Sequence, residues 1–293
     1  NAQAVLMVTV AEAMPVARLL QARVPGLRHV VTPQQLAQPG EAPAAVAVRG
    51  EDIAFIQYTS GSTGNPKGVA LTHANLLANM RAMAHAIQAS PRDVFVSWLP
   101  LYHDMGLIGA WLAPMYVGFP LVVMSPLLFL SRPLRWLQAV HRWRGTLSAG
   151  PNFAYELCLK RIADAELAGL DLSCWRLAFN GAEAVSPDTV QRFSERFAAC
   201  GLAKEAMAPV YGLAECSVGL LFPPLGRVAP IDVIRREPFT RERRAVPADP
   251  GDATALRFPA CGSPLPGHEV RLVDDNGHDV AERVEGRLWF RGP

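Results

Sequence analysis

The sequence feature that most constrains this chain is an eleven-residue run of glycines and hydroxyl side chains that closes on a lysine, residues 58–68 (YTSGSTGNPKG). Its three glycines let the backbone turn several N–H groups toward one point, and its serines and threonines add further donors. Lys67 supplies a compact positive charge. The run therefore predicts a loop that grips a polyphosphate. It lacks the Gly-Lys-Ser/Thr of the Walker A pattern, which argues against an ordinary P-loop kinase or GTPase.

Apolar segments flank this run on both sides. Residues 53–58 have the composition of a strand, and residues 68–71 resume an apolar run before Thr72, which we expect to cap a helix. The pattern predicts strand, loop and strand, a hairpin held over the phosphates. The alternative is a flexible glycine- and serine-rich linker, but such linkers rarely lie between two apolar strands and end in Pro-Lys-Gly.

At these residues the chain resembles the adenylate-forming superfamily, whose members activate a carboxylate with ATP. The resemblance implies ATP and Mg²⁺ as cofactors and a catalytic role for Lys67. It assigns nucleotide binding to the loop residues Thr59, Ser60, Gly61, Ser62, Thr63, Gly64 and Lys67. The resemblance extends over most of the chain, from about residue 53 to residue 293, and is weakest before the loop.

The composition is that of a globular chain with a sizeable core, because half of the 293 residues are apolar. The formal net charge of +2 argues against a nucleic-acid partner of the basic-groove type. The five cysteines are widely spaced and form no C-x-x-C pair, which indicates neither a disulfide framework nor a zinc site and fits a reducing cytoplasm. The longest apolar run, residues 118–130, is interrupted by Gly118, Pro120 and Pro126, so we expect no membrane span.

Strand-like and helix-like segments alternate along most of the chain and predict an α/β fold of layered sheets with packed helices, followed by a β-rich C-terminal part. We expect residues 1–48 to be the end of a preceding α/β unit, residues 49–221 to form the nucleotide- and acyl-binding core, and residues 222–293 to form an insertion-like segment and a β-rich tail. By composition, residues 222–259 are typical of a solvated irregular surface and residues 33–43 of a plain surface loop. The chain opens on no translation start, so we expect it to be the central part of one AMP-binding adenylation domain, without the C-terminal lid domain.

A second informative segment, residues 99–106 (LPLYHDMG), follows an apolar strand and precedes a helix predicted over residues 107–116. It places His103 and Asp104 at a strand's carboxyl end, where open α/β sheets bind ligands. Taken alone, the pair is explained by helix capping, with Asp104 near the positive end of the helix. The string resembles the fatty acyl-AMP ligase branch of the superfamily. That resemblance makes His103 catalytic and puts both residues in the acyl pocket, near the reacting carboxylate.

Two further segments carry residues that the resemblance assigns to the site. Gly150, Asn152 and Phe153 lie where a helix begins and resemble the stretch that lines the acyl tunnel, with ordinary helix packing as the alternative for the aromatic side chain. Small residues after the strand predicted at 175–179 would let a flat ring approach the backbone. Without the resemblance this second segment is only a turn. The family's matching segment lies against adenine and consists here of Asn180, Gly181, Ala182 and Glu183.

Residues 211–215 (YGLAE) form a compact nucleotide-binding pattern. Tyr211 can stack on a base, Gly212 allows close approach, and the Glu215 carboxylate can hold Mg²⁺. The resemblance adds Leu213 to the nucleotide-binding residues and makes Glu215 both a catalytic residue and the metal ligand. A tyrosine and a glutamate at this spacing are ordinarily surface residues, so the assignment depends on the other motifs. The fatty acyl-AMP ligases typically read Tyr-Gly-Leu-Ala-Glu, as here, where many other members have Thr in place of Ala.

The motifs and the resemblance together predict ATP-dependent activation of a medium- to long-chain fatty acid to acyl-AMP, with release of pyrophosphate. The resemblance implies that the acyl group passes to the phosphopantetheine thiol of an acyl carrier protein in a polyketide or peptide synthase. An acyl-CoA synthetase or an amino-acid-activating adenylation domain is the alternative, and Asp104 keeps the second open because it could pair with a substrate ammonium. An alternative of another class is a non-catalytic nucleotide-binding module. Two family elements, an aspartate motif and the lid with its lysine, are missing from residues 1–293, so we expect this chain alone to bind nucleotide weakly.

Overall fold

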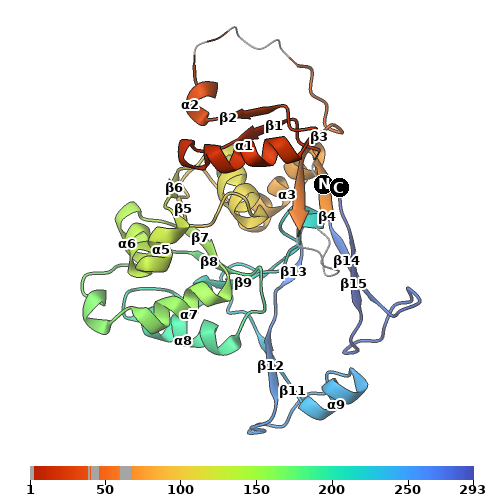
Figure 1. Ribbon diagram of the computed structural model, residues 1–293. Helices are drawn as coiled ribbons and strands as arrows, with labels where there is room; N and C mark the ends of the chain where they lie inside the picture. Colours follow the sequence, from red (N-terminus) through yellow and green to blue (C-terminus); the bar gives the residue numbers. More distant parts are fainter. Residues whose placement is uncertain (1–2, 39, 41–45, 60–66) are drawn as a thin grey trace. The chain divides into compact units, whose positions relative to one another are not determined.

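The computed structural model describes residues 3–38, 40, 46–59 and 67–293, in a chain that divides into two compact units, Asn1–Val48 and Arg49–Pro293 (Figure 1). The first unit pairs two parallel strands, β1 (Leu6–Val8) and β2 (His29–Val31), joined through the 3-10 helix η1 (Ala11–Ala13) and helix α1 (Met14–Arg23). A short helix, α2 (Pro33–Leu36), follows where the composition indicates only a surface loop. Thr32 and Gln35 form a capping box that starts this helix, which corrects the expectation.

The second unit begins with the predicted hairpin. Strands β3 (Ile53–Thr59) and β4 (Lys67–Thr72) are antiparallel, and Thr59 pairs with Lys67. Thr72 then caps helix α3 (His73–Ala86), because its hydroxyl accepts a hydrogen bond from the Asn75 N–H while the Asn75 side chain accepts one from the Thr72 N–H. The two strands and the helix cap are confirmed. Lys67 and α3 therefore belong to one continuous strand–helix segment.

Five parallel strands form the central sheet of the second unit, in the order β6-β5-β7-β8-β9 (Figure 1). Their bounds are β5 (Phe95–Ser97), β6 (Leu121–Val123), β7 (Leu147–Gly150), β8 (Leu177–Asn180) and β9 (Met207–Pro209). Every residue of β5, β7, β8 and β9 is buried, as expected for a parallel sheet covered on both faces. Strands β6 and β7 lie on opposite sides of β5, so the strand order reverses there. Such a reversal leaves a crevice at the carboxyl ends of the strands.

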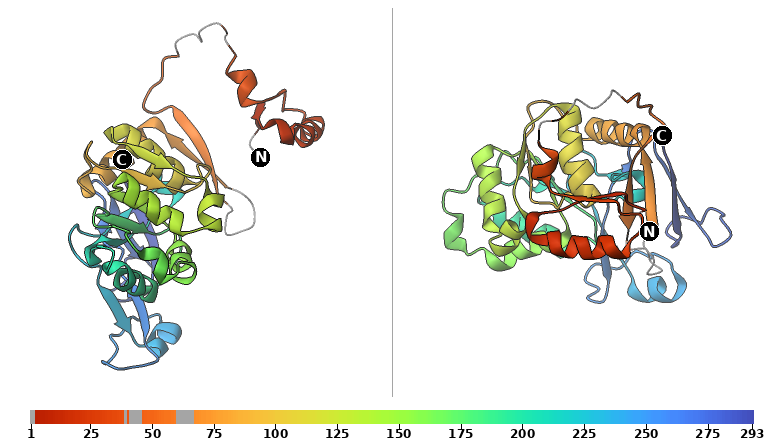
Figure 2. Two further views of the ribbon diagram at one scale, coloured as in Figure 1. Left: turned by 90° about the vertical axis from the view of Figure 1, so that its left-hand side faces the viewer. Right: turned by 45° about the horizontal axis from the view of Figure 1, so that its top comes forward.

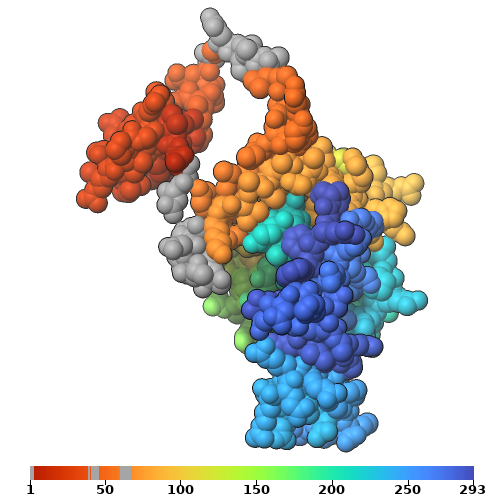
Figure 3. All heavy atoms as spheres, turned by 90° about the vertical axis from the view of Figure 1, so that its right-hand side faces the viewer, coloured from red at the N-terminus to blue at the C-terminus, as the bar shows by residue number. Residues whose placement is uncertain are grey.

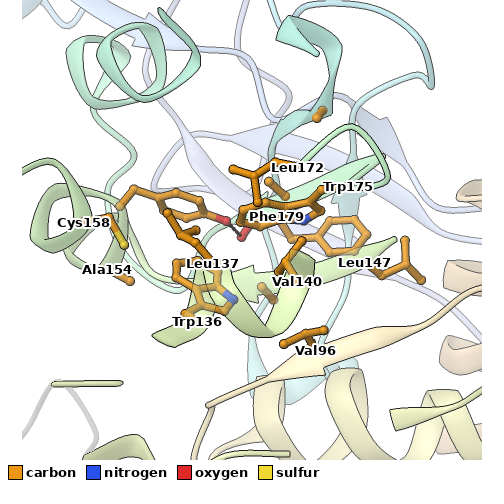
Figure 4. Close-up of a cluster of buried hydrophobic side chains, with 14 of the residues drawn as sticks. Val96, Trp136, Leu137, Val140, Leu147, Ala154, Cys158, Leu172, Trp175 and Phe179 are labelled. Carbon is orange, nitrogen blue, oxygen red and sulfur yellow. Dashed lines mark hydrogen bonds between the residues drawn. The ribbon is translucent and has the colours of Figure 1, made fainter. Parts of the chain in front are cut away.

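One face of this sheet packs against helices α6 (Leu134–Trp143), α7 (Asn152–Arg161) and α8 (Pro187–Ala198), with the short helix α5 (Pro126–Ser131) before them. Trp136 and Tyr155 are fully buried there, with their rings edge to face and the centroids 5.4 Å apart. Trp136 Nε1 donates to Ser148 Oγ at 2.8 Å and the Tyr155 hydroxyl donates to the Phe179 carbonyl at 2.7 Å. Both rings thus bury a large apolar area with their polar atoms satisfied. Figure 4 shows Trp136 inside this cluster.

The other face of the sheet packs against a π-helix, which in turn packs against α3. Residues 107–116 are helical as expected, and they belong to the π-helix η2 (Met105–Leu112) and to helix α4 (Ala113–Val117). This helical segment stops at Gly118, whose φ is +87°. Gly106 in the first turn has no room for a side chain, because a Cβ would lie 2.1 Å from the Pro100 carbonyl oxygen. Apolar periodicity does not distinguish a π-helix from an α-helix, and so the sequence did not reveal it.

The remaining strands form short antiparallel pairs. They are β10 (Leu221–Phe222) with β13 (Ser263–Pro264), β11 (Ile231–Ile234) with β12 (Leu256–Pro259), and β14 (Glu269–Val273) with β15 (Arg287–Arg291). The β-rich C-terminal part is confirmed. The expectation of irregular surface for residues 222–259 is wrong, because β11, helix α9 (Arg236–Glu242) and β12 form a hairpin that extends from the rest of the second unit (Figure 2). The same hairpin stands out in light blue in Figure 3.

Three further 3-10 helices complete the second unit, η3 (Asp164–Leu167), η4 (Lys204–Ala206) and η5 (Ala214–Cys216). Within the part of the chain that the structure describes, no helix combines the length and the apolar character that a bilayer crossing requires.

Candidate active site

A cavity of about 550 Å³ is lined by residues of the sheet, α3 and η2. Strand β7 shows how the sheet divides its side chains: Ser148 bonds to Trp136 on one face, whereas its neighbour Leu147 lines the cavity on the other. Phe95 of β5 and Phe179 of β8 line the cavity as well. The cavity therefore lies where the strand order reverses, the usual place for a ligand in an open α/β sheet.

Polar residues from widely separated segments meet in this cavity. Lys67 of the hairpin and Glu215 of η5, 148 positions later, line the same walls. The nucleotide-binding interpretation requires such a shared cleft, since one residue is assigned to the phosphates and the other to the metal. The polar lining residues are Thr59, Lys67, His103, Asp104, Tyr211 and Glu215.

The hairpin contributes two of these residues. Lys67 begins β4 opposite Thr59, and the Thr59 hydroxyl lies 3.5 Å from the Lys67 carbonyl oxygen. Lys67 is exposed, so its ammonium group can reach a ligand in the cavity. The other predicted loop residues, Ser60, Gly61, Ser62, Thr63 and Gly64, lie outside the described residues, and their nucleotide-binding role stays a prediction.

His103 and Asp104 form a close pair on the cavity wall. The imidazole Nδ1 lies 2.7 Å from Asp104 Oδ1, and the same oxygen accepts a hydrogen bond from the Met105 N–H at 2.6 Å. The hydrogen bond that the His103 imidazole donates to Asp104 raises the pKa of His103 above its ordinary value of 6.5, while partial burial opposes the rise. Asp104 is thus both the N-cap of η2 and a lining residue of the cavity, so the two interpretations drawn from the sequence do not exclude each other.

The segment assigned to adenine lies at the end of β8, and one of its four residues, Ala182, is part of the cavity lining. Ala182 has a φ of +65°, and a Cβ on Gly181 would lie 2.9 Å from the Val210 carbonyl oxygen. Asn180 is fully buried, with its side-chain Oδ1 unpaired within the described residues. The Glu183 carboxylate accepts a hydrogen bond from the Phe153 N–H at 2.6 Å, so it anchors the start of α7.

The segment assigned to the acyl tunnel makes packing contacts at the start of α7, and its substrate-binding role stays a prediction. Gly150, Asn152 and Phe153 are described residues, and none of them is part of this cavity's lining. Asn152 Oδ1 accepts from the Ser186 N–H at 3.0 Å, and the Phe153 ring meets the Trp98 ring edge to face at 6.1 Å. These contacts match the alternative of ordinary helix packing.

The Tyr211 segment lines the cavity with all of its residues from Tyr211 to Glu215. A Cβ on Gly212 would lie 1.7 Å from the Val218 carbonyl oxygen, so only glycine fits where the loop folds on itself. Tyr211 is 40% exposed, which leaves its ring accessible to a flat ligand. Glu215 is exposed at the turn of η5.

Reasoning from the sequence missed the apolar walls of the cavity. Met83 of α3 lines the cavity and packs in the same core cluster as Met80. The four-residue spacing along η2 and α4 is the signal that could have identified the other wall. The residues at this spacing are Met105, Gly109, Ala113 and Val117.

The carboxylates at the cavity suit Mg²⁺ if a bound ligand supplies further oxygen atoms to the metal. Among the described residues, no group of three or more His, Cys, Asp or Glu side chains could hold a metal ion. Glu215 and Asp104 each bring a carboxylate to the cavity. Mg²⁺ is commonly bound by one or two carboxylates together with substrate phosphates, which matches this arrangement.

A protein-family model described as AMP-binding enzyme matches residues 2–293. The chain belongs to this family. The AMP-binding chain is 40% identical over 243 residues to a medium-chain fatty acid–acyl carrier protein ligase of Teredinibacter turnerae. The matched region covers 83% of this chain and 38% of that protein. A structure from work on fatty acyl-adenylate ligases of E. coli and L. pneumophila matches with a TM-score of 0.94 at 36% identity, over 99% of this chain and 53% of that chain.

A fatty acyl-adenylate ligase of L. pneumophila, solved in complex with acyl adenylate and pyrophosphate, matches this AMP-binding chain with a TM-score of 0.87 at 33% identity. The match covers all of this chain and 50% of that one. These similarities confirm the expected fold class and the resemblance to the fatty acyl-AMP ligases. The chain spans between 38% and 53% of the length of the three relatives.

Proposed function

We propose that the complete protein activates a medium- to long-chain fatty acid with ATP, forming acyl-AMP and releasing pyrophosphate. The observation that carries this proposal is a single cavity that combines Lys67, His103 and Glu215 with the apolar side chains of α3, η2 and the sheet. For this reaction, the polar nucleotide and the alkyl chain of the fatty acid have to bind next to each other in one site. The acyl adenylate and pyrophosphate bound to the L. pneumophila relative support the same chemistry here.

The reaction needs positioning and charge neutralisation more than covalent help from the protein. A carboxylate oxygen of the fatty acid attacks the α-phosphorus of ATP, the bond from that phosphorus to the bridging oxygen breaks, and the electron pair leaves with pyrophosphate. Lys67 binds the outer phosphates and offsets their charge. His103, kept positively charged to a higher pH by Asp104, orients the attacking carboxylate. Bound Mg²⁺ supplies further charge neutralisation at the phosphate oxygens, and Glu215 would hold it.

The base and ribose of the nucleotide are assigned to the wall formed by Ala182 and the Tyr211 segment. Tyr211, Gly212 and Leu213 line the cavity together, and the glycine lets the ligand approach the backbone. Asn180, Gly181 and Glu183 act from behind this wall, because Glu183 fixes the start of α7 and Gly181 allows close contact with Val210.

The apolar walls are assigned to the alkyl chain. Each methylene that leaves water contributes about 0.8 kcal/mol, so a cavity of this size favours a fatty acid over a small polar acid. The medium-chain specificity in the name of the T. turnerae relative supports this choice. Asp104 already accepts hydrogen bonds from His103 and from the Met105 N–H, which disfavours a role in binding a substrate ammonium and hence the amino-acid alternative.

We assign the second step to an acyl carrier protein. The T. turnerae relative is named for transfer to such a partner, and the acyl group would pass to a phosphopantetheine thiol, as in a polyketide or peptide synthase. The cytoplasm, where ATP is available, is the expected compartment.

Hydroxylamine trapping tests the proposal in the complete protein. With ATP and Mg²⁺, we expect a hydroxamate from saturated fatty acids and none from amino acids. Hydroxamate from amino acids alone would favour the amino-acid-activating alternative, and none from any carboxylate would leave a non-catalytic nucleotide-binding module. Transfer of labelled acyl groups to a phosphopantetheinylated carrier protein, with free CoA as the competing acceptor, distinguishes a fatty acyl-AMP ligase from an acyl-CoA synthetase.

A further inference from the structure

The loop between Tyr211 and Leu221 carries Glu215, and backbone hydrogen bonds join its two ends. The Tyr211 N–H donates to the Leu221 carbonyl at 3.0 Å, and the Leu220 and Leu221 N–H groups donate back to the Tyr211 carbonyl at 3.0 and 2.9 Å. Glu215 itself is exposed and lies on η5, a single turn of 3-10 helix whose other two residues, Ala214 and Cys216, are buried. A turn of this kind has poor internal hydrogen-bond geometry. The position of Glu215 therefore depends on what holds the rest of the loop.

One buried side chain outside the loop holds it. Asn79 of α3 is 2% exposed, and its Nδ2 donates to the Gly219 carbonyl oxygen at 2.8 Å while its Oδ1 accepts from the Gly219 N–H at 3.2 Å. Asn79 thus satisfies both backbone polar groups of a residue 140 positions away. Because the contact is buried, its loss would leave the Gly219 N–H without a partner and the Gly219 carbonyl with only the weak donor Cys216 Sγ, 3.5 Å away.

The backbone on either side of Gly219 is tightly constrained. A Cβ on Gly219 would lie 2.8 Å from Met83 Sδ, so α3 approaches the loop closely. Ser217 has a φ of +70°, a backbone conformation that residues other than glycine rarely adopt. Backbone strain of this kind persists only where surrounding contacts over-determine it, and Asn79 supplies two such contacts.

We infer that Asn79 is a positioning residue that fixes the loop from Tyr211 to Leu221 on α3 and so sets where Glu215 can hold Mg²⁺. The consequence for Mg²⁺ rests on the proposed function, whereas the holding of the loop does not. Helix α3 continues directly from β4, whose first residue is Lys67. One strand–helix segment thus carries the phosphate-binding lysine and the support of the metal-binding loop.

Hydrogen–deuterium exchange of peptides that cover residues 211–221 tests directly whether Asn79 holds the loop in place. In Asn79→Ala we expect these amides to exchange roughly tenfold faster, because the loss of a buried hydrogen-bonded pair makes local opening easier. Asn75→Ala is the matched control. Its side chain lies one turn earlier on α3 and bonds to Thr72 instead of the loop, so we expect lower thermal stability and unchanged loop exchange. Equal loop exchange in Asn79→Ala and the wild type would overturn the inference.

Metal dependence in the complete protein separates positioning from general destabilisation. In hydroxamate formation, we expect Asn79→Ala to raise the Mg²⁺ concentration for half-maximal rate about tenfold, with the fatty-acid KM changed less than about twofold. Asn79→Asp keeps the shape and the acceptor but loses the donor, and it serves as the test variant if Asn79→Ala does not fold. A lower kcat with unchanged Mg²⁺ dependence in both would reject the inference. If the wild type forms no hydroxamate, the proposed function fails, while the exchange experiment still decides whether Asn79 holds the loop.

Discussion

His103 Nδ1 and Asp104 Oδ1 lie 2.7 Å apart on the wall of the cavity, and this contact orients the imidazole and favours its charged form. The hydrogen bond raises the pKa of His103, so the charged form persists to a higher pH in the folded chain than in the unfolded one. The stabilising contribution is complete below the unfolded pKa, near 6.5, and is lost as the pH rises through the raised folded pKa.

Asp104→Asn should therefore lower the pKa of His103. We expect the alkaline limb of the fatty-acid kcat/KM profile to move to lower pH, because the imidazolium that orients the carboxylate is lost earlier. Lys67 and Glu215 line the same cavity and are unchanged by this substitution. An NMR titration of the His103 ring protons measures the pKa, and an unshifted pKa would show that Asp104 does not control the charge.

Glu215→Gln should lower the rate of acyl-AMP formation about 10²–10³-fold, the usual effect of losing one preorganised electrostatic contact. Glu215 is exposed, so the thermal stability should change little. Glu237→Gln on α9 is the matched control, because Glu237 is also exposed and its partner Arg241 lies outside the cavity. A pyrophosphate-exchange assay measures the effect. Turnover at the wild-type rate would remove Glu215 from the metal site.

Gly109→Leu should shift the substrate preference toward fatty acids with shorter chains. Gly109 lines the cavity from η2, and a Cβ there would meet no atom within 4 Å, so a larger side chain can enter the open space. Each methylene of the substrate that loses its apolar contact costs about 0.8 kcal/mol, or about fourfold in kcat/KM. Competition between saturated fatty acids of different length measures the change, with Gly109→Ala as the graded control. Equal discrimination in all three proteins would argue that the alkyl chain lies elsewhere.

Gly212→Ala should disrupt nucleotide binding. Its Cβ would lie 1.7 Å from the Val218 carbonyl oxygen, which is backbone, so the loop has to open. Overpacking of this kind typically costs about 1–3 kcal/mol of stability. Gly109→Ala adds the same methyl group in open space and is the matched control. Calorimetric titration with Mg²⁺ and ATP measures the effect, and wild-type affinity in Gly212→Ala would contradict the close packing of this loop.

Features that depend on near neighbours in the sequence could be predicted. The two strands of the hairpin and the Thr72 cap follow from apolar patterning and from a side chain three residues away. The His103–Asp104 pair was predictable for the same reason, since adjacent residues at a strand end need no distant partner to meet.

Features that depend on distant contacts could not be predicted. The Asn79–Gly219 contact joins residues 140 positions apart, and nothing in the neighbourhood of Asn79 distinguishes it from a core amide. Glu183 illustrates the same limit, because its bond to the Phe153 N–H makes it an anchor of α7, a role that no local pattern encodes. The β11–β12 hairpin was missed because its strands are only four residues long and lie in a stretch rich in proline and arginine.

In the proposed function, the π-helix carries residues that contact the fatty-acid chain, and other elements carry the residues that act on ATP. Along η2 and α4, the residues that line the cavity carry no charge, and the phosphate and metal roles that we propose fall on the hairpin and on the loop after β9. On the proposed function, we expect substitutions at Gly109 or Ala113 to change the accepted acyl length without disturbing Lys67 or Glu215. One helical segment would then set acyl-chain selection, while the residues proposed for adenylation stay the same.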